Sequence, residues 1–184
     1  MGNFLANPAF MSSSINGSLL VERARGFALR FHGDQKYGEH PYSVHLEAVA
    51  VLARPYGAWA EAVSWLHDVV EDTPATLVDI ELEFSLYGRV LVALLTDEPG
   101  ETRKIRKAAT YKKLAKVEDT SFERLALVVK ACDRLANVRS CLQTNSGLLQ
   151  MYAKEQEVFR AACYRPGLCD PIWEELDQIF PVKI

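Results

Sequence analysis

The sequence LHDVVEDT, residues 66–73, sets one imidazole and three carboxylates within six consecutive positions. It ends a stretch of about residues 58–70 whose apolar side chains recur at the spacing of an amphipathic helix. Side chains three or four positions apart are neighbours on a helix, so we expect one polar cluster, made by His67, Asp68, Glu71 and Asp72. This cluster is either a solvated polar face or a site for a divalent cation. No Lys or Arg shares these turns, so the like charges repel, and a bound metal ion is the simplest cation that relieves the repulsion.

A second polar group interrupts a long apolar helix expected at about residues 122–142. Ten of the fourteen residues at positions 125–138 are apolar, so we expect this helix to be central and largely buried. Within KACDRLANVR, residues 130–139, Asp133 and Asn137 lie four positions apart and share a face. A buried carboxylate must be paired or must coordinate a metal. Asp133 therefore either pairs with Lys130 or Arg134, or joins a metal site.

A third stretch, PYSVHLEAVA at residues 41–50, contributes His45 near the start of an expected helix. A histidine among apolar residues is more often a hydrogen-bonded core residue than a ligand, and for His45 alone that interpretation stays open. Together the three stretches supply two imidazoles and two carboxylates: His45, His67, Asp68 and Asp133. This donor set suits a six-coordinate divalent ion such as Mn²⁺ with open positions for water. Mixed nitrogen and oxygen ligation argues against a closed thiolate zinc site.

An isolated His, an adjacent His–Asp pair and a distant Asp, all on helices, resemble the HD phosphohydrolase superfamily. The segments HGDQKYGEHPYSVH, LHDVVEDT and KACDRLANVR are similar to the hydrolase domain of RelA/SpoT homologues, especially the stand-alone small alarmone hydrolases, over about residues 24–142. The resemblance implies one Mn²⁺ ion per chain on the four ligands above, with Glu71 and Asp72 as the catalytic pair that activates or positions the attacking water. It also implies hydrolysis of the 3′-pyrophosphate of (p)ppGpp or (p)ppApp, giving GDP/GTP or ADP/ATP plus pyrophosphate.

The same resemblance indicates part of the substrate contacts. It places Asn137 near the bound nucleotide and Lys36 close to a basic position that holds the substrate. The sequence departs from the family pattern at three points. The loop at residues 35–41 is about one residue shorter than in the long bifunctional enzymes, Leu46 replaces a common proline, and Ala136 replaces a common histidine. These departures put the base preference in doubt and remove no metal ligand.

A basic helix, expected at about residues 102–117, contains the run TRKIRKAATYKK. It is either an ordinary solvated face or the source of one or two cations that clamp the leaving pyrophosphate. From this helix we assign Lys104 and Lys107 to the substrate. Tyr37, in the loop beside the His45 segment, and Arg139 complete the predicted substrate contacts.

Helical periodicity recurs along the chain and strand patterns are almost absent, which predicts an all-α, single-domain helical bundle of the HD type with about nine helices. The predicted helices cover about residues 18–31, 43–54, 58–70, 77–84, 88–96, 102–117, 122–142, 148–162 and 171–180. Pro74 is expected at the first position of the fourth of these. The hydrolase domain is predicted at residues 17–184, after a flexible lead-in at residues 1–16.

Composition narrows the class of protein. A hydrophobic share of 49% and a charged share of 24% are typical of globular domains, and the net charge of -3 disfavours broad contact with nucleic acid. No stretch approaches the ~20 apolar residues of a membrane helix, and the first residues lack a signal-peptide pattern. The four cysteines form no CxxC pair, which favours reduced structural thiols. We therefore expect a cytoplasmic protein whose partner is a small nucleotide, with no nucleic acid and no membrane; the sequence gives no oligomeric state.

Two alternative functions remain open at this stage. The same metal chemistry would serve an HD phosphohydrolase acting on another nucleotide, such as NADPH or a deoxynucleotide. The chain would otherwise be a non-catalytic HD scaffold that binds an alarmone without cleaving it. The acidic pair Glu71 and Asp72 speaks against the scaffold, because a pure binder needs no water-activating carboxylate beside a metal.

Overall fold

The structure is a computed structural model that describes residues 16–144 and 147–181. Its elements in chain order are α1 (Gly17–His32), β1 (Lys36–Tyr37), β2 (His40–Pro41), α2 (Tyr42–Ala53), a 3-10 helix (Arg54–Tyr56), α3 (Ala58–Leu66), α4 (Val69–Asp72), α5 (Leu77–Leu95), α6 (Arg103–Leu114), α7 (Arg124–Thr144), α8 (Leu148–Cys163) and α9 (Asp170–Ile179). The all-α class predicted from the sequence is confirmed, with one two-stranded hairpin as its sheet within the described residues. The predicted lead-in, residues 1–16, lies outside the described residues except for its last residue.

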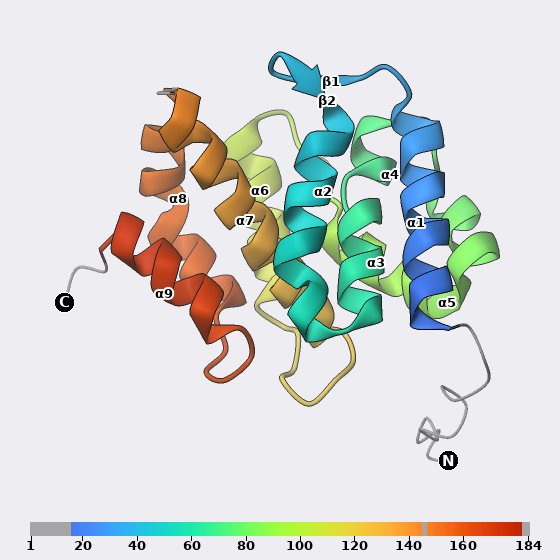
Figure 1. The fold of residues 1–184 in the computed structure, drawn as a ribbon. Helices are drawn as coiled ribbons and strands as arrows, with labels where there is room; N and C mark the ends of the chain where they lie inside the picture. Colours follow the sequence, from blue (N-terminus) through green and yellow to red (C-terminus); the bar gives the residue numbers. More distant parts are fainter. Residues whose placement is uncertain (1–15, 145–146, 182–184) are drawn as a thin grey trace.

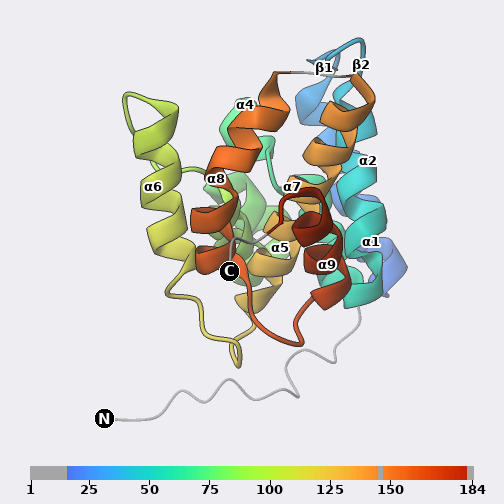
Figure 2. The same ribbon diagram turned by 90° about the vertical axis from the view of Figure 1, so that its left-hand side faces the viewer.

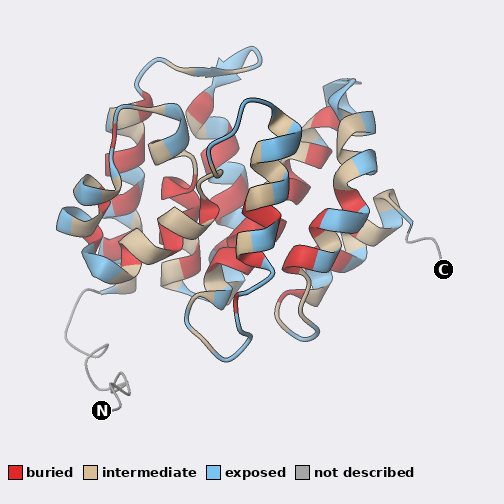
Figure 3. Ribbon diagram, turned by 180° about the vertical axis from the view of Figure 1, so that it is seen from behind, coloured by how far each residue is buried: buried red, intermediate tan, exposed pale blue. Residues whose placement is uncertain are grey.

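Helix α7 is the centre of the molecule. It packs against α2, α3, α5, α8 and α9 (Figure 1 and Figure 2). Most of its residues are buried, as ten apolar residues in fourteen predicted. One hydrophobic core runs from Leu20 on α1 to Leu176 on α9, and Figure 3 shows the buried positions along the inward sides of the helices. The packed neighbours of α7 therefore fix the positions of its charged side chains.

The helix predicted at about residues 58–70 is interrupted at the functional motif. Helix α3 ends at Leu66, and the short α4 begins at Val69. The imidazole Nδ1 of His67 lies 2.6 Å from the carbonyl oxygen of Ser64, so the ring occupies an acceptor that a continuing helix would offer to a backbone N–H. The break turns His67 inward.

A β-hairpin connects α1 to α2. Lys36 pairs with Pro41 and Tyr37 with His40 in antiparallel register, and Gly38 turns the chain with φ of 59°. This segment was predicted as a loop. The hairpin lies at one end of the bundle, over the start of α2 (Figure 1).

Helix α5 joins two segments that the sequence predicts as separate helices. They meet at a kink at Ser85, where φ is 67° and ψ is 174°. The helix begins after Thr76, whose side chain accepts a hydrogen bond from the backbone N–H of Asp79 in a capping box. The prediction that Pro74 starts this helix is therefore wrong, because the Thr76–Asp79 box fixes the helix start later in the chain.

None of the helices in the described residues is long and apolar enough to cross a membrane. The four cysteines, Cys132, Cys141, Cys163 and Cys169, are free and buried.

Candidate active site

Three separate segments bring imidazoles and carboxylates to one point between α2, α4 and α7. Ligand atoms of His45, His67 and Asp133 all lie within 4.8 Å of one another. The two Nε2 atoms are 3.3 Å apart, and Oδ1 of Asp133 lies 3.4 Å from that of His45 and 3.6 Å from that of His67. Oδ2 of Asp68 lies 3.0 Å from Nε2 of His67 and 3.6 Å from Nε2 of His45. The four predicted ligands thus converge, and His67 is fully buried, whereas Glu71 and Asp72 are exposed to solvent.

The ring orientation of His67 suits metal binding. Its Nδ1–H donates to the carbonyl of Ser64, which turns Nε2 toward the carboxylates; the Nε2 lone pair becomes available to an ion when the ring is neutral. A hydrogen bond from the second ring nitrogen fixes the tautomer in this way at most histidine metal sites. Two imidazole nitrogens and two carboxylate oxygens therefore form a chemically suitable donor set for a divalent ion.

The electrostatics of the cluster are dominated by its two carboxylates. Burial by itself lowers the pKa of His67, but the charges of Asp68 and Asp133 outweigh it and raise that pKa to about 10. Burial likewise disfavours the Asp133 carboxylate, yet its contacts with the two imidazoles and Lys130 hold its pKa well below the usual range. The cluster is a strong attractor for positive charge.

The acidic pair lies beside the cluster. The Tyr42 hydroxyl lies 2.7 Å from Oδ2 of Asp68 and 2.7 Å from Oδ2 of Asp72. Burial, and then the charge of Asp68, raises the pKa of Tyr42 well above its ordinary value, so the hydroxyl keeps its hydrogen and donates it. Glu71 accepts a hydrogen bond from the backbone N–H of Asp97 at 3.1 Å, and burial is the main cause that raises its pKa.

A cavity of about 720 Å³, including its open mouth, adjoins the cluster. The imidazole and carboxylate side chains form one part of its wall. The other part carries four cations: Arg103, Lys107, Lys130 and Arg134. A lining that combines carboxylates, an imidazole and cations suits a phosphorylated ligand with a metal ion.

Arg134 is the most deeply held of these cations. Its guanidinium lies between the rings of Tyr152 and Phe159, at 4.6 Å and 4.4 Å from the centroids. Its Nη2 donates to the Tyr111 hydroxyl at 2.7 Å and to Glu155 at 3.1 Å. Its buried Nη1 has no protein partner among the described residues. Because a buried guanidinium needs its hydrogen bonds, this group is poised for an anion in the cavity.

Two further predicted residues meet at the hairpin side of the cavity. The Tyr37 hydroxyl donates to Oδ1 of Asn137 at 2.6 Å, and Nδ2 of Asn137 donates to Oδ1 of Asp133 at 2.6 Å. The Tyr37 ring stacks on His45 with centroids 4.7 Å apart. Tyr37 and Asn137 therefore line the cavity while also holding the metal-site residues in place.

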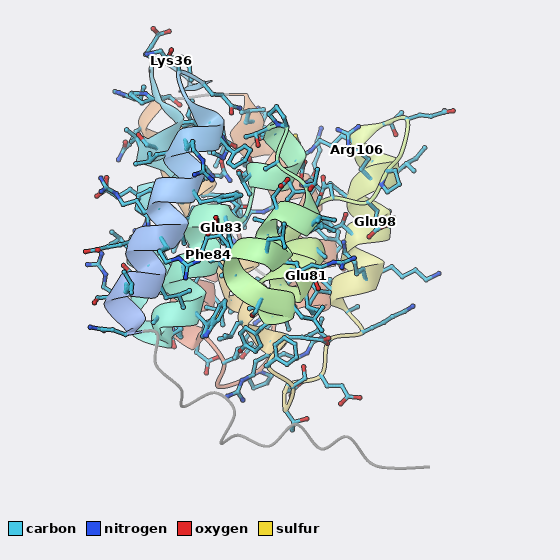
Figure 4. The ribbon with its side chains drawn as sticks, turned by 90° about the vertical axis from the view of Figure 1, so that its right-hand side faces the viewer. Lys36, Glu81, Glu83, Phe84, Glu98 and Arg106 are labelled. Carbon is cyan, nitrogen blue, oxygen red and sulfur yellow. The ribbon has the colours of Figure 1, made fainter. Side chains whose placement is uncertain are left out.

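Three predicted substrate contacts lie elsewhere. Lys36 is exposed on β1, opposite Pro41, and its side chain points away from the bundle (Figure 4). Lys104 is exposed on α6 and is not among the residues that line the cavity, although Arg103 and Lys107 of the same helix are. Arg139 is bound to Glu175 of α9 through two hydrogen bonds of 2.7 Å and 2.6 Å. None of the three is among the residues that line the cavity, and their contact with the substrate stays a prediction.

Lys130, Arg134, Arg103 and Tyr111 were not among the predicted site residues, although they line the cavity. A usable signal was present for the first two. They are charged residues on a helix predicted to be buried, at 6% and 5% exposure, and buried charges must face a polar partner. For Tyr111 the sequence carried no such signal, because its role depends on how α6 packs against α8.

Comparison with known proteins gives relatives of one kind. Over 153 residues the chain is 31% identical to the guanosine-3′,5′-bis(diphosphate) 3′-pyrophosphohydrolase of Aquifex aeolicus, a match that covers 80% of this chain and 22% of that protein. It is 33% identical over 171 residues to the probable enzyme of the same name from Synechocystis (88% of this chain, 22% of that protein). It is 30% identical over 171 residues to the GTP pyrophosphokinase of Streptomyces coelicolor (88% and 20%). The chain thus spans about a fifth of the length of these curated relatives.

A solved structure gives the same result for the fold. It is described as a metazoan ortholog of SpoT that hydrolyzes ppGpp and plays a role in starvation responses. It matches with a TM-score of 0.75 and 24% identity, over 91% of this chain and 97% of that chain. No family model matches the sequence. Over most of its length the chain is therefore similar to one part of RelA/SpoT-type proteins, and its fold matches that of a SpoT ortholog.

Proposed function

We propose that this protein hydrolyses the 3′-pyrophosphate of alarmone nucleotides, (p)ppGpp first and (p)ppApp second, releasing GDP/GTP or ADP/ATP and pyrophosphate. The observation that carries the proposal is one cavity lined both by residues of the imidazole–carboxylate cluster and by four cations. A pyrophosphate group has the charge to bind both a metal ion and a row of cations. The names of the sequence relatives support the same substrate.

His45, His67, Asp68 and Asp133 would hold one divalent ion per chain, and we propose Mn²⁺ because two nitrogen and two oxygen donors suit it. When bound, such an ion lowers the pKa of water and offsets the negative charge of phosphate. The imidazoles must be neutral to act as ligands, so protons compete with the ion for them.

Glu71 and Asp72 would handle the proton of the attacking water. Both line the cavity next to the cluster. Desolvation of its carboxylate raises the pKa of Glu71, which makes it a better proton acceptor than an ordinary glutamate. Asp72, held by the Tyr42 hydroxyl, would orient the water. General-base help of this kind contributes typically 10²–10⁴-fold to a rate.

The four cations would bind the pyrophosphate and stabilise its negative charge as it leaves. Lys130 donates to the carbonyl of Leu95 at 3.1 Å and lies 3.8 Å from Asp133, so its ammonium is fixed between the two sides of the cavity. Lys107 is paired with Asp97 at 2.8 Å and Arg103 with Glu155 at 3.0 Å. These pairs orient the cations before substrate arrives, which reduces the entropy lost on binding.

The nucleoside end of the substrate would lie toward the hairpin. Tyr37 and Tyr152 line this part of the cavity and offer aromatic faces, and Asn137 offers an amide. Guanine and adenine both stack on such faces, so this arrangement suits either purine.

The test is incubation of the purified protein with Mn²⁺ and, separately, ppGpp, ppApp and NADPH, with the products separated by anion exchange. We expect GDP and pyrophosphate in equal amounts from ppGpp, and loss of both with Asp133→Ala. Release of orthophosphate from NADPH without turnover of ppGpp would contradict the proposal and favour the phosphatase alternative. Binding of ppGpp without any product would favour the non-catalytic scaffold.

A single hydrolase domain at residues 17–184 and a cytoplasmic location remain predictions. The same holds for the expected absence of a nucleic-acid partner.

A further inference from the structure

One hydroxyl group touches both the metal-side carboxylate and the acidic pair. The Tyr42 Oη atom lies 2.7 Å from Oδ2 of Asp68 and equally 2.7 Å from Oδ2 of Asp72. A tyrosine hydroxyl has one hydrogen, so it donates to one carboxylate at a time and the two carboxylates share it. The position of Asp72 is thereby tied to that of Asp68 through a single oxygen atom.

The ring that carries this hydroxyl is fixed on several sides. It is buried and stacks on His32, with centroids 4.5 Å apart and planes 9° apart. The Nδ1 atom of His32 in turn lies 2.8 Å from Oε1 of Gln35, and the backbone N–H of Tyr42 donates to the Gln35 carbonyl at 2.9 Å. The ring also meets His45 edge-to-face at 5.7 Å. The hydroxyl therefore has little freedom to follow the carboxylates, and they must follow it.

We propose that Tyr42 is a positioning residue that fixes the acidic pair relative to the metal site. Its hydroxyl would hold Asp68 in the orientation that binds the ion. It would also hold Asp72 at the distance from the ion at which its carboxylate can orient the attacking water. The part of the proposal that concerns turnover rests on the proposed function; the part that concerns metal binding does not.

The variant that separates the hydroxyl from the ring is Tyr42→Phe. Phenylalanine keeps the stack on His32 and the contact with His45, so the variant should retain the melting temperature of the wild type without metal. Removal of a hydrogen-bond partner from a ligating carboxylate typically costs 10–100-fold in metal affinity or activity. We therefore expect the Kd for Mn²⁺, measured by calorimetry, to rise about tenfold.

The expected kinetic effect lies in kcat. The hydroxyl contacts the two carboxylates and none of the four cations, so kcat for ppGpp should fall about tenfold while KM stays within about twofold. In an Asp72→Asn background the further loss in kcat should shrink, because one of the two groups that Tyr42 positions has already lost its charge. A role in packing alone would give additive losses.

Tyr87→Phe is the matched control. Tyr87 lies on α5, meets Trp59 edge-to-face, stacks on Phe122 and does not line the cavity, so the same deletion of a hydroxyl should leave Mn²⁺ affinity and kcat unchanged. The proposal is overturned if Tyr42→Phe binds Mn²⁺ as tightly as Tyr87→Phe does. Weakened Mn²⁺ binding supports it even if the wild type fails to cleave ppGpp, and that failure would overturn only the proposed function.

Discussion

At the scale of single residues, the pH dependence of the reaction should report the ionisation of Glu71. Glu71 lies near the imidazole–carboxylate cluster, and desolvation of its carboxylate raises its pKa above that of an ordinary glutamate. A base must be deprotonated, so activity should fall as the pH drops through this raised pKa, which lies above the usual ~4.3.

The pH dependence of kcat/KM for ppGpp checks this prediction. Glu71→Gln should lose the acidic limb assigned to Glu71 and reduce the rate by roughly 10²–10⁴-fold. Glu157→Gln, an exposed neutralisation on α8, serves as the control and should keep the wild-type profile. An unchanged acidic limb in Glu71→Gln would show that another group accepts the proton.

A second prediction at this scale concerns the guanidinium of Arg134. Lysine keeps the charge but cannot offer the two-pronged hydrogen bonding of a guanidinium held between two rings. Hydrogen bonds to charged groups contribute about 1.5–3 kcal/mol, so Arg134→Lys should lower kcat/KM by about 10–100-fold. The measurement is steady-state hydrolysis of ppGpp.

Arg160→Lys is the matched control for Arg134→Lys. Arg160 is also an arginine stacked on a tyrosine and paired with a carboxylate, Tyr164 and Asp177, but it lies outside the cavity. Its replacement should leave kcat/KM at the wild-type value. Equal losses in the two variants would mean that Arg134 acts only through the fold.

The residue scale also shows what sequence reasoning can reach. The convergence of His45, His67, Asp68 and Asp133 was predictable, because polar side chains on helices expected to be buried need polar partners. The ion pair of Arg139 was not predictable. Its partner, Glu175, lies 36 positions further along the chain, and only the packing of α9 on α7 reveals that ion pair.

At the scale of elements, the kink of α5 places a residue with a side chain in a backbone region that strongly favours glycine. Ser85 has φ of 67° and ψ of 174° and is exposed. Ser85→Gly should relieve this conformation and raise the free energy of unfolding by about 1 kcal/mol after the entropic cost of glycine. The melting temperature should rise by about 2–4 °C.

The control for Ser85→Gly places glycine in an ordinary helical position. Ala108 is exposed on α6, and Ala108→Gly should lower the free energy of unfolding by about 1 kcal/mol. Opposite signs for the two glycines, measured by thermal melts, are the expected result. A lower free energy of unfolding in Ser85→Gly would contradict the claim that the backbone is strained at Ser85.

The elements also show where periodicity stops being informative. Most helices fall within two residues of their predicted bounds, because apolar spacing and N-caps such as Thr102 are local signals. The break between α3 and α4 was not predicted. It depends on a hydrogen bond from the imidazole of His67 to the Ser64 carbonyl. This ring orientation is favoured by the carboxylates of Asp68 and Asp133, which contact the ring in the folded protein.

At the scale of the whole molecule, the proposed ligands come from three stretches that meet only when the chain folds. An ion that binds the folded state but not the unfolded chain stabilises by about 2.7 kcal/mol at a hundredfold excess over its Kd. For a domain of this size we expect the melting temperature to rise by about 5–10 °C with Mn²⁺ and to fall again with EDTA.

The same titration on Asp133→Ala should show no shift with Mn²⁺, because this change removes one ligand from the cluster. A shift of full size in the variant would mean that Mn²⁺ stabilises the protein from a different position.

The position of the ion is the most direct test of the account. Anomalous scattering at the manganese edge, from crystals grown with Mn²⁺, should give a single peak per chain between Nε2 of His45, Nε2 of His67 and the carboxylates of Asp68 and Asp133. The peak should vanish in His67→Ala crystals prepared in the same way. An ion bound elsewhere, or a peak that survives that substitution, would contradict the central claim that these side chains form the metal site.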